Sequence, residues 1–369
     1  MPRLLCLALA LSFLGLGVAL PSQAQSNDGT LFHQGLTQPR SSGAPKALDA
    51  LSDLVGQWDV QFTTYPTDST TVTQPAQAII TTMNRGHGYM ERLHMDDYDG
   101  AGQARSTMTF LTFTPSISQW TMGAVDSFTE SIQLFNGDLT DGALVMRDVQ
   151  RRTGSTFLVH YRVTLTRHGR DHFTQALHTS IDHGKTWRPR LTKTYTRRAE
   201  TADFMAGTSE VGRPADNLPD EARQFDFVLG DWSAQHTLTQ PNGQSFGWTT
   251  NATASYALNG HAIIEYSWFN TDPNLPEAAT TIVRIYNRAM KRWDCLYLNN
   301  RADSPLFFGG AQDGDEIVLH LFLTDSSSPI SRFVFHDVKK DTYRWYSATS
   351  SDRGKTYTKT WTIDFTRND

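Results

Sequence analysis

The sequence predicts an all-β protein built from two tandem antiparallel domains, and three observations lead to this prediction. The stretch Gly-x-Trp occurs twice in the same register, at Gly56–Trp58 and again at Gly230–Trp232. Each copy opens a segment of roughly 140 residues that reads as short alternating strands, and such internal repeats indicate duplicated units. No stretch has helical periodicity long enough for a crossover helix, so the strands are expected to pair antiparallel.

Residues 1–24 have the layout of a secretory signal peptide. Arg3 provides a positive charge, Leu4–Leu20 is a largely apolar run, and Ser22-Gln23-Ala24 offers small residues before a cleavage site at Gln25. The alternative is a membrane anchor, but the run is at the lower limit for a span and no basic cluster follows it. We expect an exported protein, periplasmic or extracellular, with no stable membrane insertion after cleavage.

The composition of the mature chain limits its partners. Cleavage leaves Cys295 as the only cysteine, so no internal disulfide is expected. The formal charge of −5 becomes −6 without Arg3, and no block of Lys or Arg is present, which argues against nucleic acid or anionic lipid as a partner. Residues 25–46 are polar and are expected to form a flexible arm. No pattern indicates an oligomeric state.

The first domain is predicted over residues 47–198. Residues 47–54 are expected to form a short helical turn ahead of Gly56. Turn residues such as Asn136-Gly137 and Asp141-Gly142 separate the strands that follow. The expected strands are Trp58–Thr64, Ala78–Met83, Tyr89–Met95, Thr107–Phe113, Gln119–Ala124, Ser131–Phe135, Ala143–Asp148, Phe157–Thr166, His172–His178 and Arg190–Thr196.

Residues 199–221 are predicted to be the interdomain linker because they are rich in Ala, Gly, Asp, Glu and Pro. The second domain, residues 222–369, repeats the plan of the first. Further features recur at nearly the same offset along the chain. They are Gly86-His87-x-x-x-Glu91 with Gly260-His261-x-x-x-Glu265, Phe113 and Trp120 with Tyr286 and Trp293, Asp141-Gly142 with Asp313-Gly314, the stretch 180–187 with 350–357, and Tyr195-Thr196-Arg197 with Phe365-Thr366-Arg367.

Either a closed barrel or a sandwich fits all-β domains of this length. A Trp on the first strand and an Arg on the last strand favour the barrel, because closure brings these strands together and lets the Arg stack on the indole. We therefore expect Trp58, Trp232, Arg197 and Arg367 to serve barrel packing.

At these residues the chain resembles the calycin, or lipocalin-like, superfamily, and each half is similar to an uncharacterised bacterial domain family within it. That family combines an FDFxxGxW start, a Tyr-x(6)-Trp hairpin and an S-x-D-x-GKTW hairpin, present here as Phe225–Trp232, Tyr286–Trp293 and Ser350–Tyr357. The first half departs from the pattern with Leu51 for the opening Phe and Phe113 for the Tyr. The resemblance covers nearly all of both domains. It implies two calycin-like barrels and no established activity.

The Ser-x-Asp-x-Gly-Lys-Thr-Trp stretch also resembles the Asp-box of sialidases and other β-propellers, which would suggest a glycosidase. Propeller blades repeat at roughly 40–50-residue spacing. The two stretches, 180–187 and 350–357, are much more widely separated, with one in each domain. We therefore interpret each of them as a hairpin that is stabilised by hydrogen bonds to its Asp side chain.

Two repeated pairs are the candidates for chemistry, His87 with Glu91 and His261 with Glu265. On a strand, residues four apart share a face but lie roughly 13 Å apart, so one ion cannot bridge them. Each His follows a turn Gly, where a rim position is expected. Each Glu lies mid-strand, and a carboxylate that faces into a barrel must meet a buried Arg, a hydroxyl cluster or a ligand group. An internal salt bridge, ligand contact and catalysis all remain open as roles.

The favoured function is binding of a small, largely apolar molecule in one or both barrels, because barrels of this size either enclose one ligand or fill with side chains. No C-x-x-C, H-E-x-x-H, phosphate loop or nucleophile elbow occurs, so no metal site and no cofactor are predicted. One alternative is a barrel isomerase, cyclase or hydrolase with Glu91 or Glu265 as acid/base. Another is a structural or partner-binding envelope protein with filled barrels. The predicted ligand contacts are Glu91, Glu265, His87, His261, Trp120 and Trp293, although core filling is the other role open to the two Trp.

Overall fold

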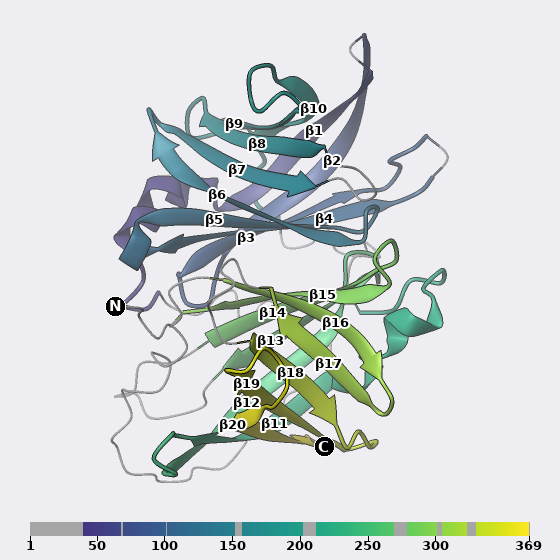
Figure 1. Ribbon diagram of the computed structural model, residues 1–369. Coiled ribbons are helices and arrows are strands. Elements are labelled where there is room, and N and C mark those ends of the chain that lie inside the picture. The colour runs from purple at the N-terminus through teal and green to yellow at the C-terminus, as the bar shows by residue number, and fades with distance from the viewer. Residues whose placement is uncertain are drawn as a thin grey trace.

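The computed structural model contains two closed antiparallel barrels of ten strands each (Figure 1). It describes residues 40–67, 69–100, 102–151, 157–201, 212–268, 279–300, 305–322 and 330–368. The predicted signal peptide, residues 25–39 of the predicted arm and residues 202–211 of the predicted linker lie outside these ranges. None of the described helices is long and apolar enough to cross a membrane.

In both barrels each strand pairs with the next one along the chain, and the first strand also pairs with the last. Barrel 1 consists of β1 (Gly56–Thr67), β2 (Thr70–Met83), β3 (Gly88–Met95), β4 (Arg105–Thr114), β5 (Gln119–Asp126), β6 (Ser131–Thr140), β7 (Ala143–Arg151), β8 (Leu158–Arg167), β9 (His172–Ser180) and β10 (Arg188–Arg197). Barrel 2 consists of β11 (Gly230–Thr239), β12 (Ser245–Ala257), β13 (Ala262–Trp268), β14 (Ala279–Asn287), β15 (Arg292–Asn299), β16 (Leu306–Asp313), β17 (Glu316–Leu321), β18 (Ile330–His336), β19 (Thr342–Ser350) and β20 (Thr358–Arg367). The predicted all-β fold of two tandem barrels is confirmed.

Each of the ten strands expected in the first domain is present, but one predicted turn was wrong. Gly137 lies inside β6 as the cross-strand partner of Trp120. The other predicted turn, Asp141-Gly142, is present between β6 and β7, and both of its residues have positive φ. A Cβ atom at Gly137 would collide with the backbone of β7, and Gly310 has the same close contact with β17 opposite Trp293. The glycine therefore permits a close backbone approach beside a large indole rather than a turn.

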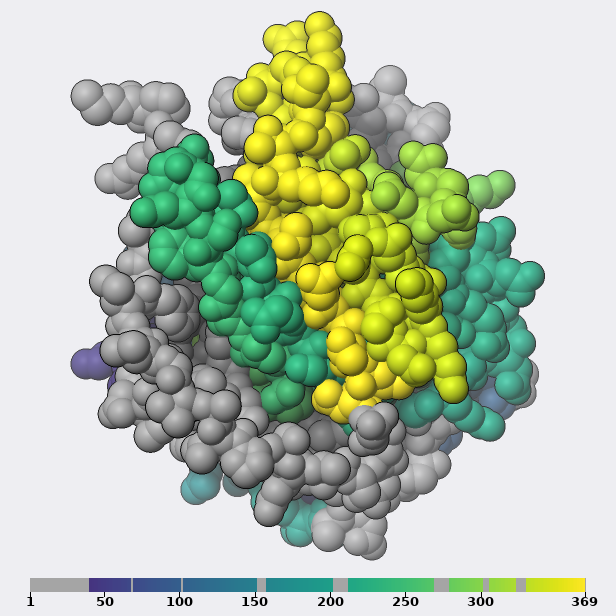
Figure 2. All heavy atoms as spheres, turned by 90° about the horizontal axis from the view of Figure 1, so that it is seen from below, coloured from purple at the N-terminus to yellow at the C-terminus, as the bar shows by residue number. Residues whose placement is uncertain are grey.

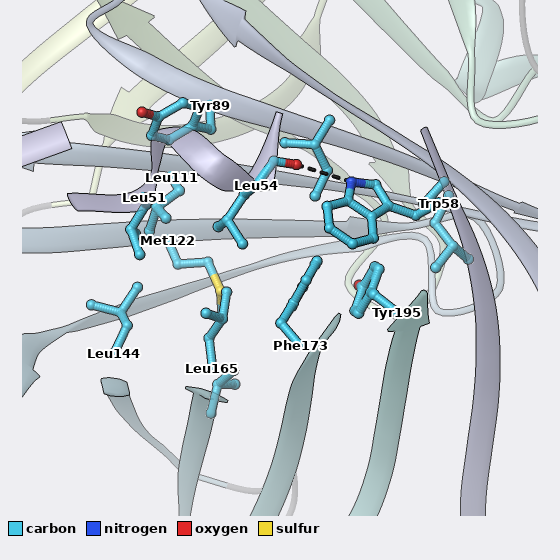
Figure 3. Packing of buried hydrophobic residues seen from close by; sticks show 14 of the residues in the cluster. Leu51, Leu54, Trp58, Tyr89, Leu111, Met122, Leu144, Leu165, Phe173 and Tyr195 are labelled. Carbon is cyan, nitrogen blue, oxygen red and sulfur yellow. Dashed lines mark hydrogen bonds between the residues drawn. The ribbon is translucent and has the colours of Figure 1, made fainter. Parts of the chain in front are cut away.

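The repeated Trp and Arg close each barrel as predicted. Trp58 on β1 lies opposite Arg197 on β10, with Cζ of the Arg 4.2 Å from the ring centroid. The Trp58 indole also donates a 2.9 Å hydrogen bond to the carbonyl of Leu54 (Figure 3). Trp232 and Arg367 repeat this arrangement at 4.2 Å. Figure 2 shows the pairing of first and last strands in barrel 2, with the green β11 beside the yellow β20.

Short 3₁₀ helices cap one end of each barrel. The cap of barrel 1 is η1 (Lys46–Leu54), which matches the helical turn expected at residues 47–54 and buries Leu48, Leu51 and Leu54 in the core. The cap of barrel 2 is formed by η3 (Asp220–Arg223) and η4 (Asp226–Val228) with the buried Phe225. A third short helix, η2 (Pro115–Ile117), connects β4 to β5. In Figure 1 the two caps lie on opposite sides of the molecule, so the barrels point in opposite directions.

The barrels pack side by side through their outer walls, with β3 to β6 of barrel 1 against β13 to β15 of barrel 2 (Figure 1). The apolar cluster between them includes Met90 and Phe110 from barrel 1 and Ile264, Val283 and Leu296 from barrel 2. This contact explains why every residue of β3 is buried. Alternate side chains of that strand face the lumen and the neighbouring barrel.

The two Asp-box hairpins have the hydrogen bonds expected of a structural turn. Asp182 accepts bonds from the backbone nitrogen and Oγ1 of Thr186 at 2.9 and 2.6 Å, and Asp352 accepts the same pair from Thr356 at 2.9 and 2.7 Å. Hydrogen bonds from Ser180 and Thr186 hold the pKa of Asp182 well below its usual value. Each barrel has one such hairpin, between its last two strands, so these hairpins do not mark propeller blades.

Candidate functional site

The lumen of barrel 1 contains a buried polar cluster centred on Glu91 of β3. The ammonium of Lys193 lies 3.3 Å from both carboxylate oxygens of Glu91. The hydroxyl of Tyr195 donates a short hydrogen bond to Oε1 of Glu91 and lies 3.5 Å from Oε1 of Gln175. Glu91, Lys193 and Tyr195 are only 7%, 5% and 1% exposed. Glu91 therefore takes part in the internal salt bridge that was one of its three expected roles.

Strand alternation and barrel closure bring these residues together. On β3, Tyr89, Glu91 and Leu93 face the lumen, whereas Met90 faces barrel 2. On β10, Tyr195 lies opposite the lumen residue Val60 of β1, and Lys193 two residues earlier shares its face. Only β1 and β2 separate β10 from β3 around the closed barrel, so a long lysine side chain can reach the glutamate.

A cavity of ≈ 40 Å³ adjoins this cluster. It exceeds the ~15 Å³ that one water needs, and it is well below the ~150 Å³ of an apolar cavity known to hold benzene. Molecules of a few heavy atoms fit it without rearrangement. The wall is apolar except on the side of the polar cluster. The lining residues are Leu54, Ile80, Tyr89, Glu91, Thr109, Leu111, Met122, Leu144, Met146, Val163, Leu165, Phe173, Gln175 and Tyr195. Figure 3 shows the apolar part of this wall, with Leu144, Leu165 and Phe173 on the side opposite the η1 cap.

The electrostatics of the cluster favour fixed hydrogen bonding. Burial, and then the charge of Glu91, raise the pKa of Tyr195 well above its usual value, so the phenol stays protonated and donates to the carboxylate. A buried ion pair needs such additional hydrogen bonds to offset the desolvation of its charges. The amide nitrogen of Gln175 donates only a weak bond, 3.6 Å to the sulfur of Met122. Glu91 and Gln175 can therefore offer an acceptor and a donor to a bound molecule.

Barrel 2 keeps the glutamate but gives it a different partner. Glu265 of β13 faces the lumen, and its Oε2 lies 2.8 Å from Nη2 of Arg284 on the neighbouring β14. Ser267 donates a 3.2 Å hydrogen bond to Oε1 of the same carboxylate. The guanidinium of Arg284 also lies over the rings of Phe225 and Phe335, at 5.3 and 5.7 Å from their centroids. This ion pair is packed within the aromatic core of the barrel.

The two lumens differ at matched positions of the repeat. Gln175, Lys193 and Tyr195 of barrel 1 occupy the places that Trp345, Ile363 and Phe365 occupy in barrel 2. An apolar and aromatic wall thus replaces the polar cluster of barrel 1 in barrel 2. A continuous series of ring contacts runs along that wall through Phe333, Trp345, Trp361, His236 and Trp248.

The two predicted site histidines lie in turns at the capped ends of the barrels. Burial, and then the charge of Arg40, lower the pKa of His87 to about 4. Nδ1 of His261 lies 3.0 Å from Oε1 of Glu130, which belongs to the β5–β6 turn of barrel 1, and Oε2 of that glutamate lies 2.8 Å from Nε of Arg288. His261 therefore contributes to the contact between the barrels.

The two predicted site tryptophans lie in the barrel cores. Trp120 is 3% exposed, packs edge-on against Phe113 at 5.3 Å, and is not among the residues that line the cavity. Trp293 is 1% exposed, packs against Tyr286 at 5.7 Å, and its indole nitrogen donates a 3.1 Å hydrogen bond to Gln224. Among the described residues, no three His, Cys, Asp or Glu side chains are grouped so that they could hold a metal ion.

Sequence reasoning missed Lys193, Tyr195, Gln175 and Arg284. A signal for the first two was present, because they lie four and two residues before Arg197, whose side chain was expected to stack on Trp58 at the barrel end. Period-two alternation then places all three on the lumen face. No comparable signal points to Gln175.

No protein-family model matches the chain, and no curated protein matches it. Among solved structures, the chain is similar to a protein of unknown function from the DUF3598 family of Nostoc punctiforme, with 11% identity over 88% of this chain and 100% of that chain and a TM-score of 0.25. It is also similar to an S-type phycobiliprotein lyase from Guillardia theta, with 14% identity over 41% of this chain and 96% of that chain and a TM-score of 0.29. A transferrin binding protein B double mutant from Haemophilus parasuis matches with 8% identity over 84% and 75% of the two chains and a TM-score of 0.17.

Proposed function

We propose that the protein binds a small, largely apolar molecule with one hydrogen-bonding group in the lumen of barrel 1. The observation that carries this proposal is the ≈ 40 Å³ cavity, where an apolar wall meets Glu91, Gln175 and Tyr195. Binding sites for small molecules combine such walls with a few convergent polar groups. In this site Glu91 would accept a hydrogen bond from a ligand hydroxyl or amine, and the amide of Gln175 would donate one to a ligand oxygen.

The volume of the cavity limits the ligand. A molecule larger than a few heavy atoms would need side chains to move, and Met122 and Met146 are suited to this because both line the cavity. Methionine has three rotatable bonds and adapts readily to irregular space. The ligand class is therefore a compact amphiphile, such as a short alcohol, amine or amide.

Binding is favoured over acid–base catalysis by the titratable groups around the cavity. These groups are Glu91, Tyr89 and Tyr195. The carboxylate of Glu91 is already bonded to Lys193 and Tyr195. Burial raises the pKa of Tyr89 to about 12, and the pKa of Tyr195 is raised well above its usual value. Acid–base catalysis works best with a pKa near the operating pH, and neither phenol meets that condition.

We also propose that the protein belongs to the calycin superfamily and that it is exported. The closed antiparallel barrels, each with a Trp and an Arg stacked at closure, support membership in the calycin superfamily. The apolar run Leu4–Leu20 supports export to the periplasm or the extracellular medium. N-terminal sequencing of the protein recovered from its host should begin at Gln25, and a retained apolar run would contradict export with cleavage.

Native mass spectrometry of the protein purified from its source tests the binding function. We expect one added mass per chain that is released on denaturation. Thr109 and Ile282 are the cross-strand partners of Glu91 and Glu265, so they form a matched pair of positions in the two lumens. Thr109→Phe should fill the cavity and abolish the added mass, whereas Ile282→Phe should leave it. A chain without an added mass, or one that keeps it in Thr109→Phe, contradicts the proposal.

A further inference from the structure

The outer wall of barrel 1 carries a row of basic side chains on three neighbouring strands. Arg147 of β7 is the cross-strand partner of Arg162 of β8, and Arg162 is the partner of His178 of β9. The adjacent residues Met146 and Val163 are buried in the lumen core, so the row itself faces outward. Direct cross-strand partners have Cβ atoms about 5 Å apart, which places the two guanidinium groups within reach of one small anion.

The charges of this row are not neutralised by the protein. Neither Arg147 nor Arg162 forms an ion pair with a carboxylate among the described residues. On β6, Asn136 is the cross-strand partner of Arg147, and Asp138 lies two residues further along. Asp138 forms no ion pair with another described residue. Like charges directly opposite each other destabilise a sheet, so the row has a cost that a bound anion would remove.

Buried nitrogen atoms without partners point in the same direction. Nε of Arg162 and Nδ1 of His178 are both buried, and neither has a hydrogen-bond partner in the part of the chain that the structure describes. Burial, and then the neighbouring Arg147, lower the pKa of Arg162, and burial followed by Arg162 lowers the pKa of His178. The row thus combines unsatisfied hydrogen-bonding groups with unbalanced positive charge.

An aromatic ring holds the central arginine in place. Cζ of Arg162 lies 4.3 Å from the ring centroid of Trp187, which ends the Asp-box hairpin. Hydrogen bonds from Thr186 to Asp182 fix that hairpin. A guanidinium stacked on one face keeps its N–H groups available at the edge, which is the geometry used for oxyanion recognition.

Barrel 2 has the stacked arginine but not the row. Arg332 and Tyr357 match Arg162 and Trp187, and Cζ of Arg332 lies 4.0 Å from the Tyr357 ring. The cross-strand partners of Arg332 are His320 and Ala348. The stacked arginine is therefore part of the repeated fold, and its Nε is buried without a hydrogen-bond partner among the described residues in both barrels. The second arginine and the unpartnered Nδ1 of His178 are what distinguish barrel 1.

We propose that Arg147, Arg162 and His178 form a binding site for a tetrahedral oxyanion, the phosphate or sulfate group of a small molecule, on the outer wall of barrel 1. The two guanidinium groups would donate charge-assisted hydrogen bonds to the oxyanion from neighbouring strands. The site is separate from the lumen and does not depend on ligand binding there.

Isothermal titration of the full chain with inorganic phosphate, inorganic sulfate and phenyl phosphate tests the site, with ionic strength held constant by chloride. We expect one binding site for at least one of the two inorganic anions, and the stronger of them identifies the preferred group. Phenyl phosphate should bind at least as tightly as inorganic phosphate, because the proposed ligand carries the oxyanion on a small molecule. Arg147→Gln removes an exposed side chain without disturbing the core and should weaken binding by about tenfold or more, as expected when a charged hydrogen bond is lost.

The matched control is Arg332→Gln, which removes the stacked arginine of barrel 2 and should leave anion affinity unchanged. Arg162→Gln should weaken binding at least as much as Arg147→Gln. The proposal is overturned if neither phosphate nor sulfate binds at constant ionic strength, or if Arg147→Gln binds as tightly as the wild-type protein.

Discussion

Arg197 lies with its guanidinium stacked on the indole of Trp58, Cζ 4.2 Å from the ring centroid, although the two residues come from opposite ends of the first repeat. The same guanidinium donates hydrogen bonds to the carbonyls of Val55 and Arg170 at 3.0 and 3.3 Å. One side chain thus joins the first strand, the last strand and the end of the cap. Gly56 permits this, because a Cβ atom there would collide with Nη1 of the arginine.

Removal of the equivalent indole in barrel 2 should strongly destabilise the fold. Trp232 is 1% exposed, and its indole nitrogen donates a 2.9 Å hydrogen bond to Val228. We predict that Trp232→Ala lowers the free energy of unfolding by about 3–5 kcal/mol because it leaves a large cavity in the core. A denaturant titration that finds a loss below about 1 kcal/mol would contradict burial of this ring.

Removal of one partner of the buried ion pair in barrel 1 should lower the stability of the protein more than removal of both partners. Glu91→Gln leaves the ammonium of Lys193 buried without a counter-charge, and we predict a loss of about 3–5 kcal/mol in the free energy of unfolding. The double variant Glu91→Gln/Lys193→Met removes both charges and should recover most of that loss. A double variant no more stable than the single one, measured by urea denaturation, would contradict this account of the pair.

Stability should fall in mild acid because of His236. This side chain is 8% exposed, its Nε2 lies 2.8 Å from Oγ1 of Thr250, and its Nδ1 accepts a 3.2 Å hydrogen bond from the Trp361 indole. Burial lowers the pKa of His236 from 6.5 to about 3. Between these two values the unfolded chain therefore takes up a proton that the folded barrel does not. The contribution of neutral His236 to the free energy of unfolding is full above about pH 6.5 and is lost as the pH falls toward 3.

The size of this effect can be isolated by comparison with His236→Gln. At pH 5 the titration of His236 should lower the free energy of unfolding by about 2 kcal/mol relative to pH 7. In urea denaturation, the decrease in the free energy of unfolding from pH 7 to pH 5 should be smaller by this amount in the variant than in the wild-type protein. Equal decreases in the wild-type protein and the variant would show that His236 does not bear the lowered pKa.

Much of the fold could be predicted because the sequence repeats its own boundary signals. The two Gly-x-Trp stretches mark the first strands, and the Arg on each last strand indicates closure. Period-two alternation and turn residues located the strands between them. The error at Asn136-Gly137 has a physical reason, since a glycine is also required where the backbone of a neighbouring strand leaves no room for a Cβ atom. That requirement cannot be recognised before the pairing of β6 with β7 is known.

The candidate site was harder to predict because it depends on contacts between distant strands. The mid-strand position of Glu91 and Glu265 indicated that each carboxylate would need a partner if it faced into the barrel. Both carboxylates face the lumen and form ion pairs there. The identity of those partners depends on which strands close the barrel and on substitutions between the copies, such as Lys193 against Ile363. Both faces of β3 and of the first half of β13 are buried, one in the lumen and one against the other barrel. Hydrophobicity alone does not distinguish these two environments.

Ligand occupancy in two matched double variants distinguishes binding at the polar cluster of barrel 1 from binding elsewhere in the protein. Glu91→Leu/Lys193→Met removes the carboxylate and the ammonium of the barrel 1 cluster and leaves no hydrogen-bond acceptor at position 91. Glu265→Leu/Arg284→Met removes the ion pair of barrel 2 in the same way. Both proteins are to be purified from the source host and examined by native mass spectrometry, with urea denaturation confirming that each remains folded. We predict that the first variant loses the bound mass and that the second retains it. Retention of the mass by a folded Glu91→Leu/Lys193→Met protein would contradict binding at the polar cluster of barrel 1.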